Sequence, residues 1–162
     1  MGTQKHPKIV DPVAALYAEL KKRVGETQTG SWHTVSPKDV RDFGKVTHNK
    51  QFIHTNKKRA QKDSPYGELI AHAYLALALI PHLTSSMRPL SQDPIVNLNY
   101  GFNRVRFPEA TRIGIKLRAK RTVLSATKRE KGVLVKQAVT IQQKGLSRPT
   151  VSAESLLFLL PL

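Results

Sequence analysis

The sequence predicts an α+β fold in which a curved antiparallel sheet wraps a central apolar helix. Residues 69–83 are apolar on almost every side and rich in alanine and leucine, which is typical of a helix that lies in a core. After Asp93 the pattern changes to alternating apolar and polar residues, which is typical of strands with one solvent-facing side. Because the inner faces of such strands need covering, a sheet rolled around the helix buries both.

Two amphipathic helices are predicted before the apolar one, and each begins with a capping residue followed by proline. The first covers Asp11–Val24, with Asp11 as its cap and Pro12 at the first helical position. The second covers Pro37–Val46 and opens on Ser-Pro-Lys-Asp, the form of a capping box with proline just inside. A further short helix near Asn56–Gln61 is expected within a long polar segment.

About four antiparallel strands are predicted in the second half, joined in chain order as a meander. The alternating pattern covers Val96–Phe102, Arg112–Arg118, Val133–Gln143 and Val151–Leu160. Near the other end of the chain, Gly25–Gly30 is a polar, glycine-bounded break. We therefore expect an N-terminal helical extension, residues 1–30, and one main domain, residues 31–162.

The composition indicates an intracellular, cytoplasmic protein with an anionic partner. The 162 residues include no cysteine, which excludes disulfides, a thiolate nucleophile and Cys-based metal sites. The 27 Lys and Arg against 11 Asp and Glu give a formal net charge of +16. No apolar run is long enough to span a bilayer, and Met1–Val10 has basic residues without an apolar stretch behind them. We therefore expect neither a membrane span nor a secretory signal.

Six short motifs stand in a fixed order between Ser31 and Leu160. They are Ser31-Trp32, Asp39-Val40-Arg41-Asp42-Phe43, Gln51-Phe52-Ile53-His54, Ser64-Pro65-Tyr66-Gly67, Ile70-Ala71-His72-Ala73-Tyr74-Leu75 and Asn99-Tyr100-Gly101-Phe102-Asn103-Arg104-Val105-Arg106-Phe107-Pro108. Their order and spacing resemble the MaoC-like dehydratase family of hot-dog proteins, which includes the (R)-specific enoyl-CoA hydratases. The resemblance implies a hot-dog fold with an extra N-terminal helix. It also implies a homodimer, in which an edge strand finds a partner.

The resemblance implies a lyase that adds water to a 2-enoyl thioester, or removes it again. In such hydratases a carboxylate and a histidine five residues later hold the water and move its proton, while a backbone N–H at the start of the central helix polarises the thioester carbonyl. Here His54 takes the histidine position, and Ala73, where the family has glycine, supplies the backbone N–H. Five residues before His54 stands Asn49, where the family has aspartate.

With asparagine at position 49, the mechanism that the resemblance implies lacks its carboxylate base. An amide orients a water but cannot accept its proton, and positioned acid–base groups typically contribute about 10²–10⁴-fold. Asn49 therefore predicts a slow enzyme, a relocated base or no enzyme. His48, where the family has glycine, is one candidate for the substitute base, because a neutral imidazole accepts a proton. A non-catalytic acyl-CoA-binding hot-dog protein is the alternative.

Glu68 supports another alternative, a thioesterase. Other hot-dog proteins hydrolyse thioesters with a carboxylate near the start of the central helix. Glu68 and His72 are four residues apart and are expected to share one helical face. An acidic residue in a first turn also stabilises a helix without any catalytic role, and a histidine on an apolar helix is commonly a hydrogen-bonded core residue.

The remaining candidates concern the acyl carrier, which is coenzyme A or an acyl-carrier protein. The phosphates of coenzyme A need cations, and a basic cluster follows the site closely, namely Lys57, Lys58 and Arg59. Further substrate contacts are expected from Gln51, Gly67 and His72. We expect no metal and no cofactor beyond coenzyme A as part of the substrate. Nucleic acid is a less favoured partner, because aromatic content is only 6% and no known binding module occurs.

Overall fold

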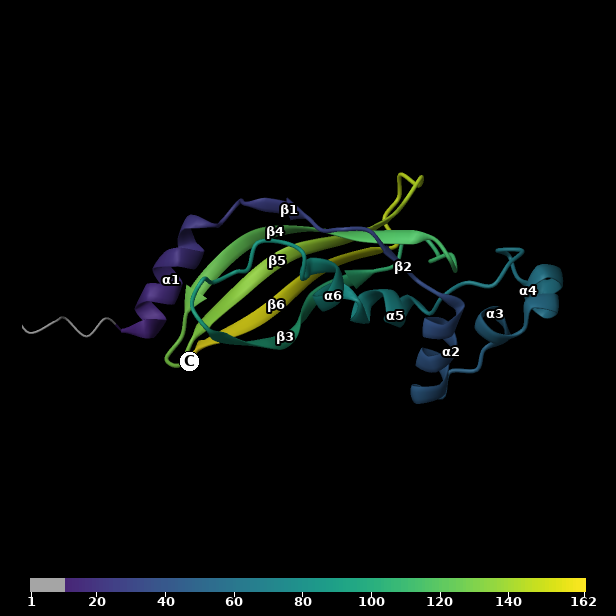
Figure 1. The fold of residues 1–162 in the computed structure, drawn as a ribbon, viewed down its shortest axis with the longest axis horizontal. Helices are drawn as coiled ribbons and strands as arrows, with labels where there is room; N and C mark the ends of the chain where they lie inside the picture. The colour runs from purple at the N-terminus through teal and green to yellow at the C-terminus, as the bar shows by residue number, and fades with distance from the viewer. Residues whose placement is uncertain (1–10) are drawn as a thin grey trace, which may run out of the picture.

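The computed structural model describes residues 11–162, which form one curved sheet with helices on it and at both its ends (Figure 1). The strands are β1 Thr27–Thr29, β2 His33–Thr34, β3 Ile95–Arg106, β4 Lys116–Lys128, β5 Val133–Gln143 and β6 Val151–Pro161. The helices are α1 Pro12–Lys22, α2 Pro37–Val46, α3 Phe52–Thr55, α4 Lys57–Asp63, α5 Ala73–Ala78 and α6 Ile80–Thr84. Residues 1–10, on which the expectation of no secretory signal rests, lie outside the described part.

The sheet is antiparallel and has the order β1-β4-β5-β6-β3, with β2 also paired to β4. Strands β4, β5 and β6 form the predicted meander. Strand β3 pairs with β6 at the far edge, so the prediction that it continues the meander beside β4 is wrong. Alternation specifies which face of a strand is buried, but it does not specify which strand lies next to it.

Several strand boundaries differ from the sequence pattern. Strand β3 covers Ile95–Arg106 where the alternation predicts Val96–Phe102, and β4 continues to Lys128, beyond the predicted end at Arg118. Strand β5 coincides with the predicted range, whereas β4 begins only at Lys116, because Ile113 and Gly114 lie in the turn that precedes it. The segment Gly25–Gly30, expected to be a break, contains β1.

Helices cover one face of the sheet, and different helices cover the two halves of that face. α5 and α6 pack over one half, whose buried residues are Leu117, Ala119, Val139, Ile141, Val151 and Ala153. α1 packs over the other half, whose buried residues are Val123, Val133, Val135, Leu157 and Leu159. Within each strand these residues alternate in step, so both halves belong to the same face. The N-terminal helix therefore forms a second apolar cluster on the same face of the sheet.

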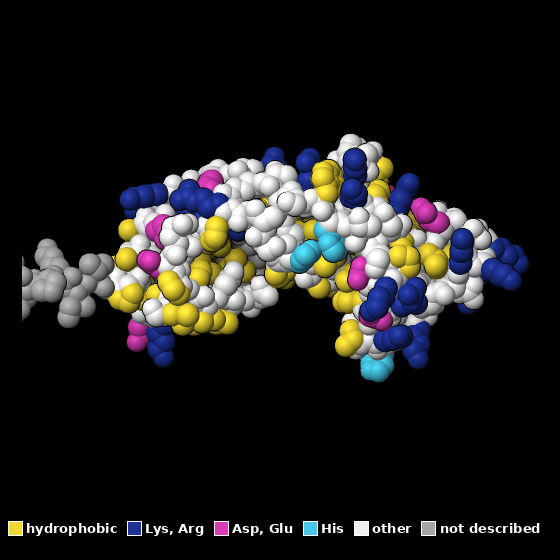
Figure 2. All heavy atoms as spheres, viewed as in Figure 1, with side chains coloured by type: hydrophobic (Ala, Val, Ile, Leu, Met, Phe, Trp, Pro, Cys, Tyr) yellow, Lys and Arg dark blue, Asp and Glu magenta, His cyan; other side chains and the backbone are white. Residues whose placement is uncertain are grey.

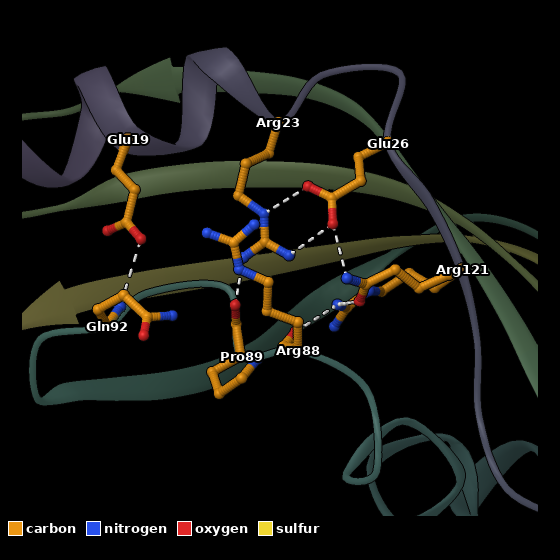
Figure 3. Close-up of polar contacts among 8 residues, drawn as sticks. Glu19, Arg23, Glu26, Arg88, Pro89, Gln92 and Arg121 are labelled. Atoms are coloured by element: carbon orange, nitrogen blue, oxygen red, sulfur yellow. Dashed lines mark hydrogen bonds and ion pairs between the residues drawn. The ribbon is translucent and has the colours of Figure 1, made fainter.

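A buried polar network lies where the two halves meet (Figure 3). Nε of Arg23 pairs with Oε2 of Glu26 at 2.8 Å, and the same guanidinium donates to the carbonyl oxygen of Pro89. Arg121 donates to the carbonyl oxygen of Arg88 at 3.0 Å. Because both guanidinium groups are buried and both bond the backbone just before β3, they fix α1 and β4 to the segment that leads into the edge strand.

The N-terminal caps of α1 and α2 confirm their predictions, although α1 ends at Lys22 and not at the predicted Val24. Oδ1 of Asp11 accepts from the N–H of Val13 at 2.9 Å. Ser36 and Asp39 form the reciprocal capping box, so α2 has the predicted bounds. The expected short helix is α4, which Asn56 caps, whereas α3 was not predicted. No helix within residues 11–162 combines the length and the apolar character that a bilayer crossing requires.

The apolar segment 69–83 begins its helix later than expected. The N–H of Ala71 donates to the carbonyl oxygen of Thr111 at 2.8 Å, so the chain is still extended there and α5 starts at Ala73. The N–H of Ala71 is therefore paired with a neighbouring segment, as in a β-sheet, and the first residues of the apolar run do not enter the helix.

The same segment is neither one helix nor buried on every side. It divides at Leu79 into α5 and α6, because Pro81 has no N–H to donate and its ring blocks a continuous helix. Tyr74 is 68% exposed and Ala78 is also exposed. The prediction of a fully buried central helix is therefore wrong for the single chain, since its sheet covers only one side of α5 and α6.

Candidate active site

His54 is held by bonds between two segments that lie side by side. The N–H of Ile70 donates to the carbonyl oxygen of Ile53 at 3.0 Å, and Nδ1 of His54 donates to the carbonyl oxygen of Ile70 at 2.8 Å. A carbonyl oxygen only accepts, so the ring hydrogen sits on Nδ1 and Nε2 keeps its lone pair. The side chain of His54 is therefore a buried ring with a defined acceptor nitrogen.

The surroundings of His54 favour its neutral form. Burial lowers the pKa of His54 below the ordinary 6.5, because desolvation penalises the charged ring. The bond to Ile70 acts in the opposite direction, and the neighbouring His72 lowers the pKa further. A neutral imidazole is the form that accepts a proton, so the direction of this shift suits a general base.

His72 lies directly against His54. The ring centroids are 3.8 Å apart and the planes are inclined by 30°, which is a stacked arrangement. Nε2 of His72 donates to the backbone carbonyl oxygen of Asn49 at 3.2 Å. One buried side chain therefore contacts both residues of the pair expected to hold the water.

Asn49 lies in the turn that leads from α2 to α3. Its side-chain oxygen accepts from the N–H of Gln51 at 3.3 Å. The preceding residue, His48, has a φ of 56°, which is the left-handed region that favours glycine. This strained turn brings the chain back toward the start of α5 directly after α2.

Two cavities meet at Asn49 and His54. The α2 cavity, of about 410 Å³, is lined by residues of α2 and α3, by Asn49 and Lys50 between them, and by Leu69 and Ile113. The α5 cavity, of about 310 Å³, is lined by Asn49, Ile53, His54, Tyr66, Ile70, Ala71, His72, Ala73, Tyr74, Phe107, Glu109, Ala110 and Thr111. The predicted imidazole, amide and helix start therefore share the α5 cavity.

The backbone N–H of Ala73 is available for a ligand. Ala73 is the first residue of α5, and the first N–H groups of a helix have no intrahelical acceptor. Within residues 11–162 this N–H has no hydrogen-bond partner. A donor of this kind in a partly enclosed cavity can stabilise negative charge on a carbonyl oxygen.

Glu68 and His48 lie outside both cavities. The Glu68 carboxylate pairs with Nε of Arg112 at 3.4 Å, and both side chains are about half exposed. The expectations that Glu68 shares a helical face with His72 and caps the helix are wrong, because α5 begins only after both residues. His48 is exposed.

The expected carrier-binding residues lie on the surface beside the site. Gln51 and Gly67 are exposed, and Gly67 has a φ of 65° in a turn. Lys57, Lys58 and Arg59 lie exposed on α4, and Figure 2 shows Lys and Arg side chains at this end of the molecule as well as at the opposite end. None of these five residues lines either cavity.

Sequence reasoning did not single out several residues that line the cavities. Arg41, Lys45 and Lys50 border the α2 cavity, and Glu109 borders the α5 cavity. Arg41 and Lys45 are four residues apart on a helix, so their common face could have been found from spacing. No local signal marks Glu109, because it reaches the site through the pairing of its segment with residues 70–71.

Sequence comparison agrees with this architecture. The family described as MaoC like domain matches residues 19–144. Nodulation protein N of Rhizobium leguminosarum bv. viciae is 33% identical over 138 residues, which are 84% of this chain and 86% of that protein. 3-hydroxyacyl-thioester dehydratase Z of Mycobacterium tuberculosis is 31% identical over 147 residues, which are 90% of this chain and 94% of that protein.

Solved structures show the same fold. An (R)-hydratase from Pseudomonas aeruginosa has a TM-score of 0.70 at 22% identity, over 90% of this chain and 84% of that one. A MaoC-like dehydratase from Rhodospirillum rubrum has a TM-score of 0.71 at 21% identity, over 86% of this chain and 93% of that one. These likenesses confirm the predicted hot-dog fold. Together with the match over residues 19–144, the observations show that this chain belongs to the MaoC-like domain family.

Proposed function

We propose that this protein is an enoyl-thioester hydratase or dehydratase in which His54 is the acid–base group. The observation that carries the proposal is that His54, Asn49 and Ala73 line one cavity. The relative from Mycobacterium tuberculosis, whose name states a 3-hydroxyacyl-thioester dehydratase, supports the same reaction class.

The chemistry follows from the groups that line the α5 cavity. Asn49 orients a water, and Nε2 of neutral His54 takes one of its protons while the water oxygen bonds to C3 of the 2-enoyl thioester. The Ala73 N–H stabilises the negative charge that collects on the thioester oxygen. His54 then returns its proton to C2, which completes the 3-hydroxyacyl thioester. Dehydration is the reverse sequence.

The direct test is hydration of crotonyl-CoA, followed as loss of the enone absorbance. Turnover above the uncatalysed rate is expected for the wild type, with a rate reduced relative to a site that has a carboxylate at position 49. Acyl-CoA binding without turnover would instead support the non-catalytic binding protein.

Thioester hydrolysis is a second candidate function, and one observation favours it. Glu109 lines the α5 cavity together with Ala73, so a carboxylate and an oxyanion donor share one partly enclosed space. Glu68, the carboxylate suggested by the sequence, does not line it. Release of free thiol from acyl-CoA, abolished by Glu109→Gln and unaffected by Glu68→Gln, would establish this activity.

The acyl carrier is coenzyme A or an acyl-carrier protein, and the protein acts as a homodimer. The edge strand β3 supports the dimer, because its free edge needs a partner and four of its apolar side chains are exposed. These are Val96, Leu98, Tyr100 and Phe102. Sedimentation velocity tests this part of the proposal. A species of twice the chain mass is expected, and a monomer at micromolar concentration would contradict it.

A further inference from the structure

We infer that His72 is a positioning residue that fixes the relative positions of Asn49 and His54 for the proposed hydration. The inference rests on the proposed function, since it assigns a role within that site. One imidazole makes two different contacts: its Nε2 donates to the carbonyl oxygen of Asn49, and its ring face stacks on His54.

The ring of His72 has little freedom to move. Its side chain is 2% exposed, and the Phe43 ring of α2 lies at a centroid distance of 5.2 Å. His54, from α3, stacks on it at 3.8 Å. Because the interior of a protein is close-packed, a ring held by neighbours from two other helices transmits its position to them.

Gly44 provides an independent sign that this geometry is required. A Cβ at Gly44 would lie 3.1 Å from the carbonyl oxygen of Asn49 and 3.3 Å from Cε1 of His72. Glycine inside a helix lowers helix stability relative to alanine, so its presence in α2 fits a need for close approach. The Asn49 carbonyl, the His72 ring and α2 therefore meet so closely that even a methyl group at position 44 would have to displace one of them by a few tenths of an ångström.

The hydrogen bonding of the two His72 ring nitrogens also fits positioning. Its Nε2 carries the hydrogen, because a carbonyl oxygen only accepts, and its Nδ1 is buried without a hydrogen-bond partner within residues 11–162. The ring hydrogen of His72 is therefore used to hold the Asn49 carbonyl, while Nε2 of His54 keeps the lone pair that the proposed proton transfer needs.

Two substitutions separate the hydrogen bond from the ring packing. His72→Phe keeps a flat ring beside His54 but removes the donor to Asn49, whereas His72→Gln keeps an amide N–H that can reach the same carbonyl. For crotonyl-CoA hydration we expect His72→Phe to lower kcat about 10–100-fold with KM changed less than about threefold, since small displacements of reacting groups carry costs of this size. His72→Gln should recover at least about fivefold of that loss. The control is His82→Gln, which changes an exposed histidine of α6 outside both cavities.

A kcat for His72→Phe that equals the wild type, or equal losses in both His72 variants, would overturn the inference. Nitrogen-15 NMR of the imidazole rings in the wild type tests it without any variant and without turnover. We expect the hydrogen-bonded hydrogen of His72 on Nε2, as the Nε2–H tautomer. A His72 ring with no hydrogen on Nε2 would overturn the inference. A wild type that shows the expected tautomer but no hydration would instead count against the proposed function alone.

Discussion

The Nδ1–H of His54 donates to the carbonyl oxygen of Ile70 at 2.8 Å. Ile70 in turn donates its N–H to the carbonyl oxygen of Ile53. Two hydrogen bonds therefore join α3, which carries the imidazole, to the extended segment before α5. Because a backbone carbonyl cannot reverse its role, this bond decides which ring nitrogen faces a substrate. The geometry of the site therefore depends on backbone groups as much as on the side chains that line it.

The lowered pKa of His54 predicts a pH-dependent stability. As pH falls below the ordinary value of 6.5, the unfolded chain takes up a proton that the folded protein resists, so the free energy of unfolding decreases until the folded-state pKa is reached. His54→Asn removes this contribution. Urea unfolding at pH 7.5 and at lower values should show a weaker pH dependence for the variant than for the wild type. An equal dependence would contradict the burial of this ring.

The capping box of α2 predicts a second, more acidic transition. The pKa of Asp39 is held below its ordinary 3.8, first by the backbone N–H of Ser36 and then by its hydroxyl. The stabilisation is present above pH 3.8 and is lost as pH falls through the lower folded-state value. At neutral pH, Ser36→Ala should lower the free energy of unfolding by about 1 kcal/mol, measured by urea denaturation. An unchanged midpoint would show that the box contributes nothing to stability.

Gly44→Ala should impair activity more than stability. The added methyl group must displace the Asn49 carbonyl or the His72 ring, which are 3.1 and 3.3 Å from its position. Alanine favours a helix over glycine by about 1 kcal/mol, and this offsets part of the crowding. We expect kcat for crotonyl-CoA to fall about tenfold while the thermal midpoint changes little. Lys38→Ala, on an exposed position of the same helix, is the matched control, and equal effects of the two variants would argue against the crowding.

The cations that border the α2 cavity should affect substrate binding more than the cations of α4. Arg41 and Lys50 border the α2 cavity, which joins the site at Asn49 and His54. If Arg41 and Lys50 hold the phosphate-bearing arm of a CoA thioester, Arg41→Ala with Lys50→Ala should raise KM several-fold with kcat nearly unchanged, because that arm takes no part in the chemistry. The control removes the α4 cations together, as Lys57→Ala, Lys58→Ala and Arg59→Ala. A larger rise in KM for this control would indicate that the α4 cations bind the phosphates, as the sequence predicts.

Local patterns in the sequence predict local structure well here. The Ser36 and Asp39 pair defines the start of α2 because a capping box is complete within four residues. The alternation of Val133–Gln143 defines β5 because each residue has only two faces to choose between. Membership of the family and the place of His54 also followed from the order of short motifs.

The rest depends on contacts between distant segments. The sequence carries no signal that Ile70 would supply the acceptor for a ring 16 residues earlier, because every residue has a backbone carbonyl. The place of Glu109 beside the site, and the start of α5 at Ala73, both follow from the bonds between residues 70–71 and 111–112. Such pairings are set by the whole fold and not by a residue's neighbours.

The most direct measurement is the rate of crotonyl-CoA hydration by Asn49→Asp, made in the wild-type and in the His54→Gln background. If position 49 and His54 hold the same water, the carboxylate should raise kcat by about 10²-fold in the first background and bring no gain in the second. A gain that persists without His54, or none at all in an Asn49→Asp variant that folds and still binds acyl-CoA, would contradict the account.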